Sequence, residues 1–330
     1  MNQIPAALTV LYTNSLSQAF HPASKAMPPL GVIGYGVKAA PSYAAAPLLP
    51  AQAAAAFEIW TAPGNITQWR TGAVTGASAD DYAFAAIEIA EKEAAGLEEA
   101  VEHAYLQIFD SLERAGFAQP IRFWNYLAAI TQNLDGMERY QRFNTGRQRA
   151  FQARLRQAVP PVASCLGACR PGSMIYVLAA RAPALAIENP RQISAYDYPP
   201  AYGPTSPSFS RASRHRAGMA DTLFVSGTAS IVGHETRHPG DFEAQLAETL
   251  RNLRMVMDLA ADGASQAGHW ALKIYLRDRL MQARVEAALI AMLGPACQRL
   301  FLLAEICRAD LLLEIEAVRC AGPPTRQNGF

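Results

Sequence analysis

Two segments of the chain carry apolar residues at spacings of three and four, with polar residues between them. They are residues 100–116, AVEHAYLQIFDSLERAG, and residues 247–263, AETLRNLRMVMDLAADG, which align at an offset of 147 positions. The spacing predicts one helix with a single buried face in each segment. Both segments end on glycine, Gly116 and Gly263, which readily takes the left-handed conformation that terminates a helix.

Short runs rich in β-branched, aromatic and small residues flank the two predicted helices and indicate strands. They lie at 70–76 and 223–229 before the helices, and at 123–127 and 271–276 after them. A further helix at 282–293 and a strand at 311–318 follow the second copy. The repeated order predicts an internal duplication and two related α+β domains. A chance match between two amphipathic helices is the alternative.

The repeat also predicts the domain boundaries. We expect an N-terminal domain at 1–160, a linking segment at 161–218 and a C-terminal domain at 219–330. The linking segment is rich in Pro, Ser, Tyr and Arg. Because long irregular segments in compact proteins are more often functional than decorative, we expect this one to line a pocket.

The composition narrows the class of function. Of 330 residues, 51% are apolar and 17% are charged, which is typical of a compact protein with enough chain for two cores. The formal net charge of +1 provides no general field for nucleic acid or an anionic membrane, so an anionic substrate needs locally placed arginines. The N-terminus lacks the features of a secretion signal, and no apolar run is long enough to span a bilayer. Five cysteines, an odd number, favour reduced thiols in the cytoplasm.

The predicted strand at 311–318 carries the first candidate for chemistry. Side chains alternate along a strand, so Glu314 shares a face with the apolar Leu312. If that face is enclosed, loss of solvent raises the pKa of the carboxyl and allows it to act as a general acid. A solvated surface carboxylate is the alternative. Arg299, fifteen residues earlier, either extends to solvent or binds a carboxylate.

Two short motifs suggest binding sites of other kinds. The small residues at 226–230, SGTAS, follow an apolar strand, and their backbone N–H groups can receive a carboxylate or carbonyl oxygen, although a plain turn is the alternative. The pairs His234/His238 and Cys165/Cys169 lack further ligands, so no metal site is expected.

Two stretches combine aromatic residues with arginine, at 139–147 and 189–211. Such segments can bind single-stranded nucleic acid by stacking and phosphate contacts. Acidic residues nearby and the near-neutral total charge argue against that interpretation. We therefore expect rigid loops that line a pocket for a carboxylated ring.

Residues 220–320 resemble the RidA (YjgF) fold in the SGTAS turn, the helix after it, the KIYLRD strand end and the LEIEAV strand. In that family an arginine that binds the substrate carboxylate precedes the strand glutamate by fifteen residues. Arg299 and Glu314 match this pair, so the resemblance favours a clamp and a catalytic carboxyl. A RidA-like imine deaminase is thus one candidate activity.

Residues 57–320 are similar to the chorismatases, which combine a RidA-like domain with a degenerate N-terminal copy. The matching stretches, in the family's order, are IRFWNYLAAI, RYQRFNTGRQRAF, NPRQISAYDYP, YGPTSPSFSRA and LFVSGTASIVGHETRHPGD. The resemblance implies cleavage of chorismate to pyruvate and a ring product without a cofactor or metal. It leaves a monomer or a homotrimer open.

The resemblance also implies roles for individual residues. Glu314 would protonate the enolpyruvyl methylene, and Cys307, seven residues earlier, is typical of members that form 3-hydroxybenzoate, sometimes with 4-hydroxybenzoate. Members that form the dihydroxy-diene carry a small residue in place of this cysteine, and that hydrolysis is the alternative. The expected substrate-binding residues are Arg299, Arg147, Tyr202, Tyr198, Arg211, Gly227, Thr228 and Ala229.

Overall fold

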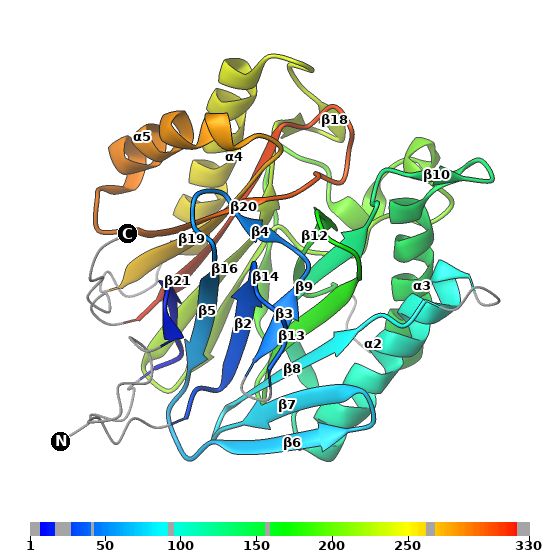
Figure 1. Ribbon diagram of the computed structural model, residues 1–330, viewed down its shortest axis with the longest axis vertical. Helices are drawn as coiled ribbons and strands as arrows, with labels where there is room; N and C mark the ends of the chain where they lie inside the picture. Colours follow the sequence, from blue (N-terminus) through cyan, green and yellow to red (C-terminus); the bar gives the residue numbers. More distant parts are fainter. Residues whose placement is uncertain are drawn as a thin grey trace.

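The computed structural model describes residues 7–16, 28–40, 43–91, 96–155, 159–261 and 268–321. Their strands form sheets of four, six and seven strands, together with two short two-stranded ribbons. Figure 1 shows α2 and α3 on one side of the molecule, α4 and α5 on another, and the large sheets between them. No helix in this described part is long and apolar enough to cross a membrane.

The first copy of the repeat is the six-stranded sheet with order β12-β9-β13-β8-β7-β6. Its strands are β6 (Thr67–Thr71), β7 (Val74–Ser78), β8 (Tyr82–Glu88), β9 (Gln119–Ala128), β12 (Val162–Ala168) and β13 (Met174–Ala180). Helices α2 (Leu97–Arg114) and α3 (Arg139–Arg154) cover one face, and the ribbon β10 (Asn133–Leu134) and β11 (Met137–Glu138) precedes α3.

The second copy is the seven-stranded sheet with order β14-β15-β16-β21-β19-β20-β4. Its strands are β4 (Leu49–Pro50), β14 (Leu185–Ile187), β15 (Ala212–Ala217), β16 (Ala220–Thr228), β19 (His269–Leu276), β20 (Gln298–Leu303) and β21 (Leu313–Cys320). Helices α4 (Phe242–Ala261) and α5 (Gln282–Leu293) cover it. The smaller elements are β17 (Ile231–Val232), β18 (Glu235–Thr236), η1 (Ala195–Asp197), η2 (Pro200–Tyr202) and η3 (Arg279–Met281).

The two copies have the same topology. The order β12-β9-β13-β8 in one sheet corresponds to β20-β19-β21-β16 in the other. The pair β12 and β9 is parallel, as is the pair β20 and β19, while β13 and β21 run antiparallel to both of their neighbours. The duplication and the α+β class expected from the sequence are therefore confirmed.

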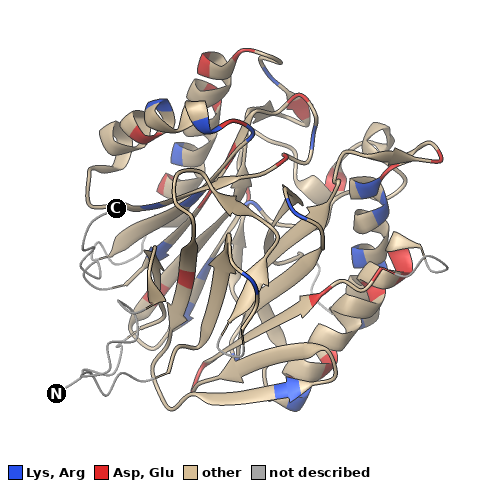
Figure 2. Cartoon of the chain, in the orientation of Figure 1, with Lys and Arg blue, Asp and Glu red and all other residues tan. Residues whose placement is uncertain are grey.

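A four-stranded sheet with order β1-β5-β2-β3 completes the molecule. It consists of β1 (Thr9–Thr13), β2 (Gly31–Tyr35), β3 (Ala44–Ala46) and β5 (Ala56–Thr61). The central core takes residues from all three large sheets, including Trp60, Trp124 and Tyr275. Two other cores lie under the helix pairs. Charged residues concentrate on the helices and connecting segments, so the few that lie on central strands stand out (Figure 2).

Three details of the sequence prediction are wrong. Residues 70–76 span the turn of the β6–β7 hairpin, and the strand before the first helix is β8, whose apolar residues do not alternate with polar ones. The segment 161–218 is not a plain linker, because β12 and β13 complete the first sheet while β14 and β15 begin the second. Residues 139–147 are helical rather than a loop, since Glu138 and Gln141 form a capping box that starts α3.

The predicted helix ends are confirmed in one copy. Gly116 follows α2 with a φ of 83°, in the left-handed region that favours glycine. Gly263 lies outside the described residues.

Candidate active site

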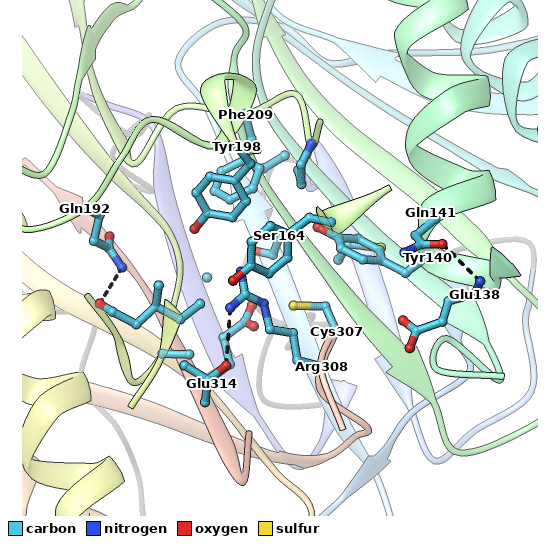
Figure 3. Close-up of a pocket in the computed structure, with 18 of the residues that line it drawn as sticks. Glu138, Tyr140, Gln141, Ser164, Gln192, Tyr198, Phe209, Cys307, Arg308 and Glu314 are labelled. Carbon is cyan, nitrogen blue, oxygen red and sulfur yellow. Dashed lines mark hydrogen bonds between the residues drawn. The ribbon is translucent and has the colours of Figure 1, made fainter. Parts of the chain in front are cut away.

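A cavity of about 370 Å³ is lined by both copies of the repeat and the segment that joins them. The first copy supplies residues of α3 and β12, and the second supplies the end of β16, the loop before β21 and β21 itself. Residues 192–211 provide another wall, as expected for a pocket-lining segment. Figure 3 shows Tyr198 and Phe209 on one side of this space, with Cys307, Arg308 and Glu314 across from them.

Glu314 projects into the cavity from β21 and is 5% exposed. Strand alternation therefore placed it on the correct face. Burial, followed by the neighbouring carboxylate of Glu316, raises the pKa of Glu314 to about 8, against the opposing influence of Arg122 and Arg211. A protonated carboxyl that lines a cavity is suited to donate a proton to a bound molecule.

Gly227 provides the space for this carboxyl. A Cβ atom built at Gly227 would overlap the Glu314 carboxylate oxygen. The pairing of β16 with β21 shifts register between Val225 and Thr228, so the backbone bulges at this glycine. The glycine of the SGTAS motif therefore leaves room for the Glu314 carboxyl because it has no side chain.

We expect Gly227→Ala to lower kcat/KM by about 100-fold or more, because a displacement of about 1 Å at a catalytic group has an effect of this size. The matched control is Ser226→Ala in the same bulge, whose buried hydroxyl lacks a hydrogen-bond partner in the described part of the chain. The steady-state kinetics of both variants check the prediction. Equal activity of Gly227→Ala and wild type would show that Glu314 tolerates another position.

Cys307 lies in the loop before β21 and lines the cavity. Burial and the nearby Glu314 raise the pKa of the Cys307 thiol to about 12, so it is neutral and not a thiolate nucleophile. Cys165 on β12 is a second cavity thiol, and burial raises its pKa well above the ordinary value. Two neutral thiols therefore shape the space beside the carboxyl.

Three arginines bring positive charge to the same cavity: Arg147, Arg211 and Arg308. Arg147 is buried on α3 and donates to Asn144 Oδ1 at 2.8 Å. Arg211 is also buried and donates to the Tyr198 hydroxyl at 2.8 Å. The Nε atoms of Arg147 and Arg211 are buried without a partner among the described residues. Guanidinium groups that line a cavity are suited to bind carboxylates.

Arg308 is the third cation, and the sequence interpretation missed it. It donates to the His234 carbonyl at 2.9 Å, and its guanidinium lies 4.3 Å from the centre of the Tyr202 ring. Tyr202 in turn contacts His234 Nδ1 at 3.1 Å. The available signal was its position directly after Cys307, in a loop between two strands.

Two expected binding residues lie elsewhere. Arg299 pairs in register with Leu272, on the sheet face covered by α4 and α5, whereas Glu314 faces the central core side. Its guanidinium donates to the Cys297 carbonyl at 2.6 Å and lies 3.4 Å from Glu286, so the expectation that it binds substrate is wrong.

Thr228 does not line the cavity, and its hydroxyl donates to the Ser226 carbonyl. Tyr198, Tyr202, Arg211, Gly227 and Ala229 do line it.

The search for metal ligands concerns only the residues that the structure describes. Among them, no three His, Cys, Asp or Glu side chains are grouped so as to hold an ion. His234 instead lies beside Tyr198 and Tyr202.

Comparison with known proteins gives consistent matches. The family model described as "Chorismatase FkbO/Hyg5-like, N-terminal" matches residues 58–179. A 3-hydroxybenzoate synthase of Streptomyces hygroscopicus is 37% identical over 276 residues, covering 79% of this chain and 80% of that protein. A chorismatase of Streptomyces rapamycinicus is 37% identical over 275 residues, covering 79% of this chain and 81% of that protein. A chorismatase crystal structure superposes with a TM-score of 0.83 and 28% identity, covering 94% of this chain and 98% of that one. The chain therefore belongs to the FkbO/Hyg5-like chorismatase family.

Proposed function

We propose that this protein converts chorismate to 3-hydroxybenzoate and pyruvate, with Glu314 as the general acid. The names of two relatives, 3-hydroxybenzoate synthase and chorismatase, support the overall conversion. The observation that carries the assignment of Glu314 is its carboxyl, buried with a raised pKa and facing a cavity that also holds three arginines.

Protonation of the terminal methylene by Glu314 would convert the enol ether to an oxocarbenium-like centre. The ring hydroxyl next to the ether, and not a water molecule, would then attack this centre, and the ring would aromatise as pyruvate leaves. No water is consumed, since chorismate has the composition of the two products together. The proton lost from the ring on aromatisation balances the one that Glu314 delivered.

Arginine side chains would hold the two carboxylates of chorismate. Arg147 and Arg211 are the best candidates, because both are buried and line the cavity. Arg308 stacks on Tyr202 at the same cavity and adds a further positive charge. Hydrogen bonds from an ionised donor to a carboxylate stabilise a complex by about 1.5–3 kcal/mol.

We expect Arg211→Met to raise KM for chorismate by about 10- to 100-fold, with a smaller change in kcat, since it removes binding present before the transition state. Arg216→Met, at an exposed arginine of the adjacent β15 that pairs with Asp221, is the matched control. Michaelis–Menten kinetics on both variants check this. An unchanged KM in Arg211→Met would remove Arg211 from the binding site.

The protein would act in the cytoplasm without a cofactor, as a monomer or as a homotrimer. A homotrimer would be detected by light scattering coupled to gel filtration.

The direct test is incubation of the purified protein with chorismate, with and without a chelator, followed by chromatographic resolution of the aromatic acids and assay of pyruvate. Pyruvate with 3-hydroxybenzoate is the expected result, and a minor 4-hydroxybenzoate peak is compatible with it. The dihydroxy-diene as the sole ring product would contradict the assigned product. Ammonia release from 2-aminoacrylate without turnover of chorismate would contradict the proposed function altogether.

A further inference from the structure

Beneath the cavity lies a group of four buried charges contributed by all three large sheets. Glu58 comes from β5, Arg122 from β9, Lys273 from β19 and Glu316 from β21, and each is at most 2% exposed. Lys273 Nζ lies 2.9 Å from both carboxylates. Two positive and two negative charges balance, which reduces the cost of taking them out of water.

Glu316 is bonded by three side chains besides Lys273. Arg122 donates to its Oε2 at 2.7 Å, and Trp124 donates to its Oε1 at 2.6 Å. Ser164 donates to Oε2 at 2.5 Å. Burial alone would raise the pKa of Glu316, yet Lys273 and Arg122 hold it below its ordinary value, so this carboxylate is ionised.

The same strand joins Glu316 to the cavity. Glu314 and Glu316 are two residues apart on β21, so their side chains project from one face with backbones about 7 Å apart. Ser164, which bonds Glu316, also lines the cavity. A fixed negative charge at this range in a poorly solvated site disfavours a second negative charge.

Other charged or titratable groups also face Glu314. Arg122 of β9 and Arg211 favour its ionised form. Four neutral groups also lie near it. Three of them interact with it electrostatically, namely Cys165 of β12, Cys307 and Tyr140 of α3, and the fourth, Tyr275 of β19, pairs with it in register. Each of the four has a raised pKa and therefore stays neutral. Glu138, Glu235 and Asp310 line the cavity as well. Glu316 is the neighbour that acts most strongly against ionisation of Glu314.

We propose that Glu316, held in place as an anion by Lys273, Arg122, Trp124 and Ser164, is a positioning residue that keeps the Glu314 carboxyl protonated at neutral pH. This rests on the proposed function of Glu314. The role explains why a carboxylate two residues from the site is tied to two cations and two neutral donors, of which only Ser164 lines the cavity.

The test uses the full chain and the pH dependence of kcat/KM for chorismate between pH 5 and 10. A general acid is active when protonated, so activity falls as the pH rises through the pKa of Glu314. Glu316→Gln removes the opposing charge, and the midpoint of this fall should move down by about one pH unit or more. Glu316→Asp retains the charge and should keep the midpoint near that of the wild type.

Two further variants separate this role from a structural one. Glu58→Gln removes the other carboxylate bonded to Lys273, from a strand that does not line the cavity, and should leave the midpoint in place. If the single variant does not fold, Glu316→Gln is combined with Lys273→Met. This double variant removes one charge of each sign, so the buried group stays electrically neutral. A downward shift in this double variant supports the proposal, whereas an unchanged midpoint, or an equal shift in Glu58→Gln, overturns it.

An infrared titration makes the two proposals separable. The stretching band of the protonated Glu314 carboxyl is identified by its loss in Glu314→Gln, and its midpoint is followed in Glu316→Gln without substrate. If Glu314→Gln retains activity, the proposed acid is wrong, but the band still tests the influence of Glu316. If Glu314→Gln is inactive and the band does not move in Glu316→Gln, only the role of Glu316 is refuted.

Discussion

Glu314→Gln is expected to lower the rate of pyruvate release from chorismate by about 100- to 10,000-fold, the range typical for loss of a general acid. Glutamine preserves the shape of the side chain but cannot deliver a proton to the enolpyruvyl methylene. Because Gly227 leaves room for a carboxyl of this size, the amide fits the same space. A coupled assay for pyruvate with purified variant measures the effect, and wild-type turnover would refute the mechanism.

Thermal unfolding distinguishes loss of chemistry from loss of structure in this variant. The pKa of Glu314 rises from an ordinary 4.5 to about 8 on folding. Because its pKa is higher in the folded state, Glu314 stabilises the fold while it is protonated. This contribution is fully present below pH 4.5 and is lost as the pH rises through 8. Glutamine does not ionise, so Glu314→Gln should match or exceed the wild-type Tm, with the advantage increasing from pH 5 to pH 9. A lower Tm at pH 9 would indicate that the carboxylate is stabilised in the fold.

Cys307→Ala is expected to change the ring product from 3-hydroxybenzoate to the dihydroxy-diene while pyruvate release continues. The neutral thiol of Cys307 occupies cavity space close to Glu314. Alanine would leave room for a water molecule to compete with the ring hydroxyl for the oxocarbenium-like centre.

Chromatography of the ring products, normalised to pyruvate, measures this switch. Cys165→Ala is the matched control, because it removes a second cavity thiol from β12. A switch in Cys307→Ala alone would support a specific role. An unchanged product ratio would contradict the assignment, and an equal switch in both variants would indicate that cavity volume, rather than Cys307, determines the product.

Local pattern was sufficient where an element is formed by contacts close in sequence. The helix predicted at 282–293 is α5 with the same bounds, and the two repeat helices lie within a few residues of α2 and α4. Alternation along 311–318 placed Glu314 and Glu316 on the correct face of β21. Periodicity was less informative for β8, because both of its faces are buried and its apolar residues do not alternate with polar ones.

Arg299 shows where spacing along the chain is insufficient. It precedes Glu314 by fifteen residues, but a loop separates β20 from β21, and the register of the parallel pair turns Arg299 toward the helices. Arg308 and Ser164 reach the cavity from segments that no periodic pattern connects to Glu314. In the sequence, Arg122 and Lys273 resemble ordinary charged residues of strands. Their burial becomes visible only when the sheets are packed together.

The sequence by itself determined the duplicated α+β plan, the family resemblance and the face of the strand that bears Glu314, because repeats and alternation are properties of neighbouring residues. Only the tertiary structure decided which arginines share the cavity, why Gly227 has no side chain and which charges surround the carboxyl. Those features depend on contacts between residues that are far apart in the chain, and the pKa of Glu314 is determined by burial and by the charge of Glu316, which residues of another sheet hold in place.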